Sequence, residues 1–178
     1  MHHPQGSQFA RYQDMPVVIF CGGTGTRMRE ETEFRPKPMV EVGGRPIVWH
    51  IMKGYAQHGF KKFILCLGYK AWMIKDYFLT HQFAANDFTL NLGTHAAQFT
   101  RPEEARDDFE ITFVDTGAEA LTSERLLRVG YLLQNKPFMV TYGDGVSDVS
   151  IQKLVEHHIR MRETHGVIGT LTGIHPKS

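Results

Sequence analysis

The fold of this chain is decided by residues 17–27, which read Val17-Val18-Ile19-Phe20-Cys21-Gly22-Gly23-Thr24-Gly25-Thr26-Arg27. The first five residues form a short, continuous apolar run that is rich in β-branched side chains. Such a run is typical of a parallel strand that helices cover on both faces. Two glycines end the run, and a long loop rich in Gly, Pro and charge follows over residues 22–46. A loop of that length in a compact domain is usually either functional or disordered.

Similar apolar runs alternate with helical patterns along the rest of the chain. The runs predict strands at residues 63–67, 111–114, 138–142 and 167–171, with residues 88–92 as an edge strand. Helical spacing predicts helices over residues 46–58, 71–79, 122–134 and 149–164, with Thr122 as an N-cap and Leu126, Leu127 and Leu133 on the buried side of the third. This alternation predicts an α/β fold, a Rossmann-like and mostly parallel sheet with helices on both faces.

Length, charge and cysteine content narrow the class of protein. The 178 residues predict a flexible leader over residues 1–15 and one domain over residues 16–178. A formal net charge of +1 argues against general binding to nucleic acid. The two cysteines, Cys21 and Cys66, lie in apolar runs and predict buried thiols rather than a disulfide scaffold or a zinc site. With no long apolar stretch and no apolar signal region in the leader, we expect a cytoplasmic setting without a membrane.

The glycine-rich loop after the first run is suited to an anion. Glycines have no Cβ, so backbone N–H groups can approach a phosphate, and Arg27 can hold one through two parallel hydrogen bonds. The loop is neither a Walker A loop, which requires Gly-Lys-Ser/Thr at its end, nor a dinucleotide loop, whose third glycine is replaced by Met28. On spacing alone, a plain glycine turn remains the alternative.

Lys37 stands between Pro36 and Pro38 in the same loop. Each proline fixes its own φ and restrains the preceding residue toward extended geometry. We therefore expect the Lys37 ammonium to be presented on a stiff backbone, as contact with a single phosphate position requires. The alternative is a rigid surface linker with a solvated lysine.

Asp144 lies between Gly143 and Gly145, directly after the apolar run at residues 138–142. The carboxyl end of a parallel strand is where α/β sheets bind ligands. A magnesium ion carrying nucleotide phosphates often takes one or two carboxylates and water. Together with the glycine loop and Lys37, Asp144 predicts a site for a magnesium–nucleotide phosphate. A turn Asp that binds its own backbone is the alternative for this residue alone.

Two motifs, Gly22-Gly23-Thr24-Gly25-Thr26-Arg27 and Pro36-Lys37-Pro38-Met39, resemble the signature of the sugar-1-phosphate nucleotidylyltransferases. Within that family the chain is similar to the branch that transfers a cytidylyl group to glucose 1-phosphate. The motifs that carry this narrower resemblance are Glu30-Glu31-Thr32, residues 39–44, residues 47–53, Gly68-Tyr69-Lys70, Val114-Asp115-Thr116-Gly117 and Thr141-Tyr142-Gly143-Asp144-Gly145. The resemblance runs from about residue 16 to residue 171.

The resemblance implies a reaction and a set of site residues. CTP and glucose 1-phosphate would form CDP-glucose and pyrophosphate with Mg²⁺, for nucleotide-sugar and O-antigen synthesis, in a homo-oligomer. By analogy Arg27 and Lys37 are catalytic, since they neutralise the triphosphate and bridge the reacting phosphates, and Asp144 binds the metal. The nucleotide-binding residues it implies are Phe20, Cys21, Gly22, Gly23, Thr24, Gly25, Thr26, Arg27, Lys37, Arg125 and Gly143, with Arg125 on the base side.

Two departures from the family pattern keep other functions open. Ser123-Glu124 stands where the family has two glycines before the arginine. Family members are also considerably longer, and the part without a counterpart here carries the sugar contacts and a second metal-binding Asp. The alternatives are a relative that uses UTP or dTTP, a nucleotide-binding module without turnover, and a scaffold without a ligand.

Overall fold

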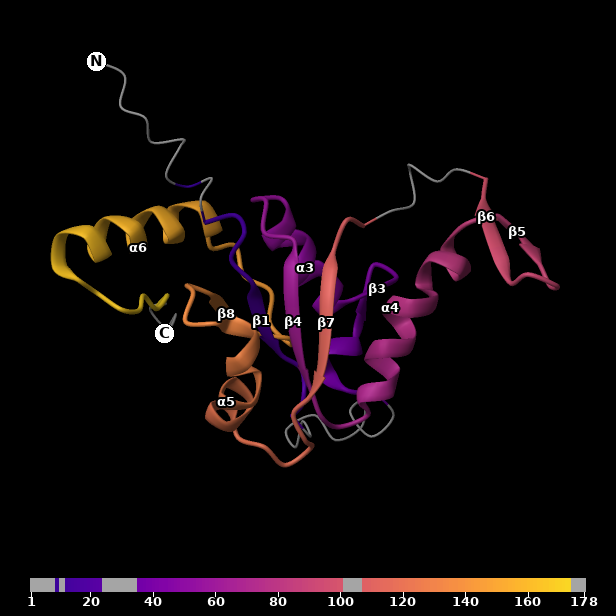
Figure 1. Ribbon diagram of the computed structural model, residues 1–178, viewed down its shortest axis with the longest axis horizontal. Helices are drawn as coiled ribbons and strands as arrows, with labels where there is room; N and C mark the ends of the chain where they lie inside the picture. Colours follow the sequence, from indigo (N-terminus) through magenta and orange to yellow (C-terminus); the bar gives the residue numbers. More distant parts are fainter. Residues whose placement is uncertain (1–8, 10–11, 24–34, 101–106, 174–178) are drawn as a thin grey trace, which may run out of the picture.

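A parallel sheet forms the centre of the molecule (Figure 1). The computed structural model describes residues 9, 12–23, 35–100 and 107–173. The sheet has the strand order β7-β4-β1-β8, and its strands are β1 (Val17–Phe20), β4 (Lys62–Leu67), β7 (Glu110–Asp115) and β8 (Met139–Tyr142). All three strand pairs are parallel, with Ile19 in register with Leu65 on one side and Thr141 on the other. The predicted parallel sheet is confirmed.

Helices cover both faces of this sheet. They are α3 (Ile47–Ala56), α4 (Ala71–Ala85), α5 (Thr122–Leu133) and α6 (Ile151–His165). Successive residues of a strand point to opposite faces. Accordingly, Val17 and Ile19 pack in one apolar cluster with residues of α3, α4 and α6, while Val18 and Phe20 pack in a second cluster with α5. Both faces of β1 are buried, which is why its sequence is apolar at every position.

Two predicted strands differ from the structure. Residues 167–171 form no strand, and Ile168 and Leu171 are fully exposed, because none of the described residues pairs with them. The predicted edge strand at 88–92 is a strand, but not of the central sheet. As β5 (Phe88–Asn91) it pairs with β6 (Ala96–Phe99) in a separate hairpin beyond the end of α4 (Figure 1).

Local hydrogen bonds explain that hairpin. The Asn91 side chain accepts hydrogen bonds from the backbone N–H groups of Gly93, at 2.9 Å, and Thr94, at 3.0 Å, which closes the turn between the strands. The rings of Phe83, Phe88 and Phe99 pack together at its base. Because β5 and β6 pair with each other, their backbone groups form hydrogen bonds without joining the edge of the central sheet.

The start of α5 also differs from its prediction. Leu121, rather than Thr122, is the residue before the first helical turn, and its backbone N–H donates to the Glu124 carboxylate at 2.8 Å. Leu127 is 79% exposed and lies outside the buried side, whereas Leu133 is buried as predicted. The buried face instead carries Arg125 and Val129, one turn apart.

The predicted loop at 22–46 contains short elements where it is described. They are a 3₁₀ turn, η1 (Lys37–Met39), and the small hairpin of β2 (Glu41–Val42) and β3 (Arg45–Pro46). The predicted leader reaches the core at Met15, which is buried, and at Phe9, whose ring packs edge-on against Phe60. Among the described residues, no helix has the length and apolar character needed to cross a membrane.

Candidate active site

The carboxyl ends of the strands meet at one edge of the sheet, because the strands are parallel. Backbone hydrogen bonds continue past the strands there: Cys21 N–H donates to Cys66, Thr116 N–H to Leu67 and Gly143 N–H to Phe20, each at 2.9 Å. The loops that leave β1, β4, β7 and β8 are therefore held side by side. This edge is the usual ligand-binding position in α/β sheets.

Two of the predicted charged groups meet at this edge. The Lys37 ammonium lies 3.8 Å from an Asp144 carboxylate oxygen. Their side chains are 23% and 43% exposed, so the pair faces solvent rather than the core. The third predicted group, Arg27, lies outside the described residues, as do Thr24, Gly25 and Thr26.

The backbone of η1 presents Lys37 to Asp144. Pro36 and Pro38 on either side of Lys37 are buried, and the turn is closed by hydrogen bonds from Met39 N–H to Pro36, at 2.8 Å, and from Val40 N–H to Lys37, at 3.0 Å. The lysine is thus held rigidly, but in a 3₁₀ turn and not in the extended form that Pro38 predicts. The closing hydrogen bonds of the turn outweigh the local preference for extended geometry.

Gly143 allows η1 to approach the end of β8. A Cβ at this position would lie 2.8 Å from the Cys21 sulfur, 3.0 Å from the Phe20 oxygen and 3.2 Å from Cγ of Pro38. A larger residue would therefore push β8 away from both β1 and η1, and with it Asp144 away from Lys37. Phe20, Cys21 and Gly22, the predicted nucleotide-binding residues at the end of β1, are buried, while Gly23 is exposed.

Arg125 reaches the same edge from α5 and is only 4% exposed. Its guanidinium donates hydrogen bonds to the Gly22 carbonyl at 3.0 Å and the Thr116 hydroxyl at 2.7 Å. The sequence did not single out Thr116 or Gly68 individually as site residues, although both lie directly against the Arg125 guanidinium. The signal was present in the sequence, since Gly68 and Thr116-Gly117 follow predicted strands just as Gly22 does.

Asp144 is suited to a metal ion that arrives with a nucleotide. Within the described ranges, no three His, Cys, Asp or Glu side chains gather as ligands for a metal ion. Magnesium bound through nucleotide phosphates needs only one or two protein carboxylates. The donor set therefore fits a phosphate-bound magnesium with Asp144 as its protein ligand, and it does not fit a cage made of protein groups alone.

The two cysteines are buried on opposite faces of the sheet, Cys21 with α3 and Cys66 with α5. Burial raises the pKa of the Cys66 thiol to about 11. The pKa of the Cys21 thiol is raised further, first by burial and then by the nearby Cys66 and Asp144. Both thiols therefore remain protonated at neutral pH, as expected of inert core residues.

Iodoacetamide at pH 8 should label both cysteines at least about a hundred times more slowly in the native protein than in guanidinium, because only the thiolate reacts. Peptide mapping by mass spectrometry measures both rates. Because the pKa of Cys66 is raised above its unfolded value of about 8.5, the stability that this thiol contributes is complete below that pH and is lost as pH rises from there through about 11. Equal labelling rates in the two states would contradict the burial.

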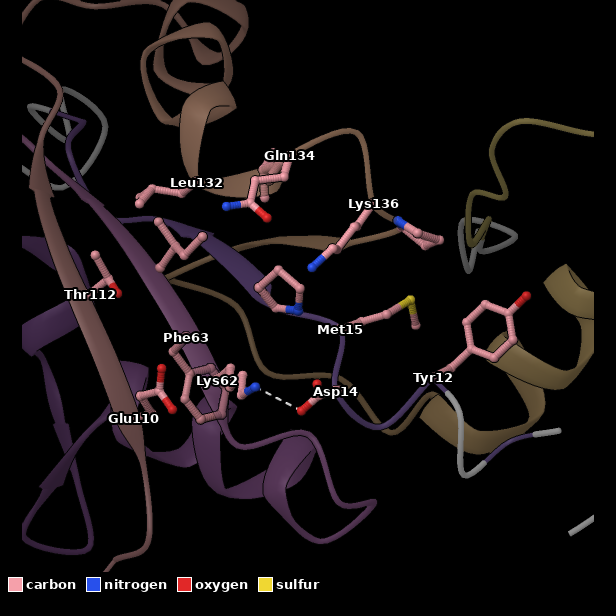
Figure 2. A pocket seen from close by; sticks show the side chains of 14 residues that line it. Tyr12, Asp14, Met15, Lys62, Phe63, Glu110, Thr112, Leu132, Gln134 and Lys136 are labelled. Atoms are coloured by element: carbon pink, nitrogen blue, oxygen red, sulfur yellow. Dashed lines mark hydrogen bonds and ion pairs between the residues drawn. The ribbon is translucent and has the colours of Figure 1, made fainter. Parts of the chain in front are cut away.

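A separate cavity of about 610 Å³ lies at the opposite, amino-terminal edge of the sheet (Figure 2). Its lining includes Lys62 and Glu110 from the starts of β4 and β7, and Gln134 and Lys136 after α5. A hydrogen bond of 2.7 Å joins Lys62 to Asp14 at its rim. Among the described residues, none of the predicted site residues lines this cavity.

A parallel sheet with charged side chains at its carboxyl edge is the arrangement in which α/β domains bind ligands. A family model for nucleotidyl transferases matches residues 16–178, and the chain belongs to that family. It is 42% identical over 163 residues to the glucose-1-phosphate cytidylyltransferase of Salmonella typhimurium. It is also 42% identical over 160 residues to a probable glucose-1-phosphate cytidylyltransferase of Bacillus subtilis. These alignments cover 91% and 90% of the chain but only 61% and 60% of the relatives.

Solved structures share the fold. HddC from Yersinia pseudotuberculosis, complexed with GMP-PN, superposes with a TM-score of 0.59 at 23% identity, over 82% of this chain and 54% of that one. A putative glucose-1-phosphate thymidylyltransferase from Bacillus anthracis, in complex with a sucrose, gives a TM-score of 0.61 at 17% identity, over 83% and 51% of the two chains. The predicted Rossmann-like α/β class is thereby confirmed.

Proposed function

We propose that this chain is the nucleotide-binding part of an enzyme that makes CDP-glucose and pyrophosphate from CTP and glucose 1-phosphate. The contact between Lys37 and Asp144 at the carboxyl edge of the sheet is the observation that carries the proposal. The 42% identity to glucose-1-phosphate cytidylyltransferases supports the choice of nucleotide and sugar. The proposal concerns the whole protein, because the chain spans 61% of that relative.

The reaction is a substitution at one phosphorus atom, the α-phosphorus of CTP. A phosphate oxygen of the sugar attacks the α-phosphorus of CTP, and the bond from that phosphorus to the bridging oxygen of the β-phosphate breaks as pyrophosphate leaves. Such a transfer needs positioning and charge neutralisation more than covalent chemistry by the protein. No covalent intermediate with the protein is required.

Each side chain of the edge then has a definite task. Lys37, braced by η1, places its ammonium where the reacting phosphates gain negative charge. Asp144 would hold a magnesium ion, which would supply positive charge to neutralise the phosphates. Phe20 and the glycines after it line the base and ribose, Arg27 neutralises the departing pyrophosphate, and Arg125 lies on the base side of the site.

Two measurements test this function. In thermal melts with magnesium and each of CTP, UTP, dTTP and GTP, we expect CTP to raise the melting temperature most, since a ligand that binds only the folded state stabilises it. Pyrophosphate release from CTP with glucose 1-phosphate then tests turnover. Preferential stabilisation by UTP or dTTP would contradict the cytidylyl assignment, and binding without pyrophosphate release would favour a module without turnover.

A further inference from the structure

We propose that the cavity at the amino-terminal edge of the sheet binds a small zwitterionic molecule, which carries an amine and an acidic group on a short apolar body. The cavity has a volume of about 610 Å³, which is typical of pockets that take small organic ligands. It lies at the edge of the sheet opposite to Lys37 and Asp144, so the inference does not depend on the proposed function. Charged side chains approach the cavity from two sides (Figure 2).

The four charged side chains that line the cavity have no net charge, and only two of them are paired. Lys62 donates a hydrogen bond of 2.7 Å to Asp14, which raises the pKa of the lysine and lowers the pKa of the aspartate. Lys136 and Glu110 form no ion pair with any described residue. Figure 2 shows these two side chains on opposite sides of the cavity. Within the described lining, one cation and one anion therefore remain to bind a ligand.

The turn after α5 forms the cationic side of the cavity. Gln134 and Asn135 both have left-handed backbone, with φ of 49° and 59°, and Lys136 N–H donates to the Leu133 carbonyl at 2.9 Å. Left-handed backbone is uncommon for residues other than glycine, and it persists at ligand sites where the surrounding structure imposes it. The turn directs both the Gln134 amide and the Lys136 ammonium to the cavity (Figure 2). An acidic group would accept hydrogen bonds from both side chains.

Residues 12–16 form another wall of the cavity and are fixed to the domain. The Gln13 side chain donates to the His58 carbonyl at 3.2 Å. Met15 is buried, and the Pro16 carbonyl accepts a hydrogen bond from Met139 N–H at 3.0 Å. The cavity is therefore formed before a ligand arrives, which reduces the loss of conformational freedom on binding.

The distribution of charge favours a ligand with two opposite charges over a ligand with one. An acid alone would pair with Lys136 and leave Glu110 unpaired beside its apolar body. An amine alone would pair with Glu110 and leave Lys136 unpaired. A molecule with both groups neutralises both side chains, and its apolar body covers the Pro16 and Leu132 side chains between them.

Nuclear magnetic resonance titrations of the full chain test this site. The probes are two zwitterions of different length, γ-aminobutyrate and ε-aminocaproate, with caproate and hexylamine as singly charged analogues. We expect the amide signals of residues 110–112 and 134–136 to shift, and the tighter zwitterion to have a dissociation constant at least about tenfold below those of both analogues. Binding no tighter than the analogues, or no shift of these signals up to about 10 mM of either zwitterion, would overturn the proposal.

Lys136 and Glu110 are exposed, so their replacement should not disturb the fold. Lys136→Met and Glu110→Gln should each raise the dissociation constant of the tighter zwitterion about tenfold. Lys136→Met should weaken caproate but not hexylamine, and Glu110→Gln should do the reverse.

Lys153→Met is the matched control, because Lys153 is an exposed lysine of α6 that does not line the cavity. It removes the same charge and should change the dissociation constant of the zwitterion less than about twofold. An effect as large as that of Lys136→Met would reduce the binding to general charge attraction and overturn the assignment. No nucleotide enters these titrations, so a chain that fails to bind CTP would still decide the question.

Discussion

Replacing Lys37 by methionine is expected to lower pyrophosphate release about 10²–10³-fold, the range seen when one preorganised donor to a transition state is lost. Lys37 is the described cation that faces Asp144, and η1 holds its backbone in place. Methionine keeps the apolar stem and removes only the charge. Stability should change by less than about 1 kcal/mol, because the pair with Asp144 is partly exposed.

Lys61→Met is the matched control for this experiment. Lys61 is also paired with an aspartate, Asp108 at 2.7 Å, but it precedes β4 at the opposite edge of the sheet. Its replacement should leave pyrophosphate release unchanged. If the chain binds CTP without turnover, the dissociation constant for CTP replaces the rate, and it should rise for Lys37→Met alone. A Lys37→Met variant with wild-type rate and affinity would remove Lys37 from the site.

Replacing Gly68 by alanine is expected to destabilise the fold by about 1–3 kcal/mol, the range for overpacking a filled site. The added methyl would lie 2.7 Å from two backbone oxygens, those of Gly22 and Gly117. Backbone oxygens cannot rotate away as a side chain can, so whole loops must shift. Gly68 does not have positive φ, so the effect comes from contact and not from backbone strain.

Replacing Gly54 by alanine is also a glycine-to-alanine change, but we expect it to have the opposite effect on stability. Gly54 lies within α3, and apart from the backbone of that helix no atom of the described residues lies within 4 Å of where its Cβ would be. Alanine there should stabilise the protein by about 0.5–1 kcal/mol, because glycine loses more backbone freedom in a helix. Urea denaturation of both variants measures the two changes. Equal midpoints for Gly68→Ala and the wild type would show that the three loops are not packed as described.

The apolar runs in the sequence were sufficient to predict the strands of the central sheet. The runs around Ile19 and Leu65 are apolar at successive positions because helices cover both faces of these two central strands, and burial of that kind can be read from sequence alone. Residues 167–171 have the same apolar character, yet no described residue pairs with them. A strand depends on a partner, and composition does not tell whether one is present.

Chain order and residue type also predicted that Lys37 and Asp144 lie at the same edge of the sheet, where the two side chains do meet. A proline-flanked lysine and an aspartate at the end of a parallel strand are both directed to the same edge, whatever the details of packing. Only the tertiary structure decided how they meet, because Pro38 rests against Gly143 and that contact joins segments far apart in sequence. The same holds for Arg125: the sequence marks it as a cation on a helix, but its surroundings of carbonyls exist only once three strands lie side by side.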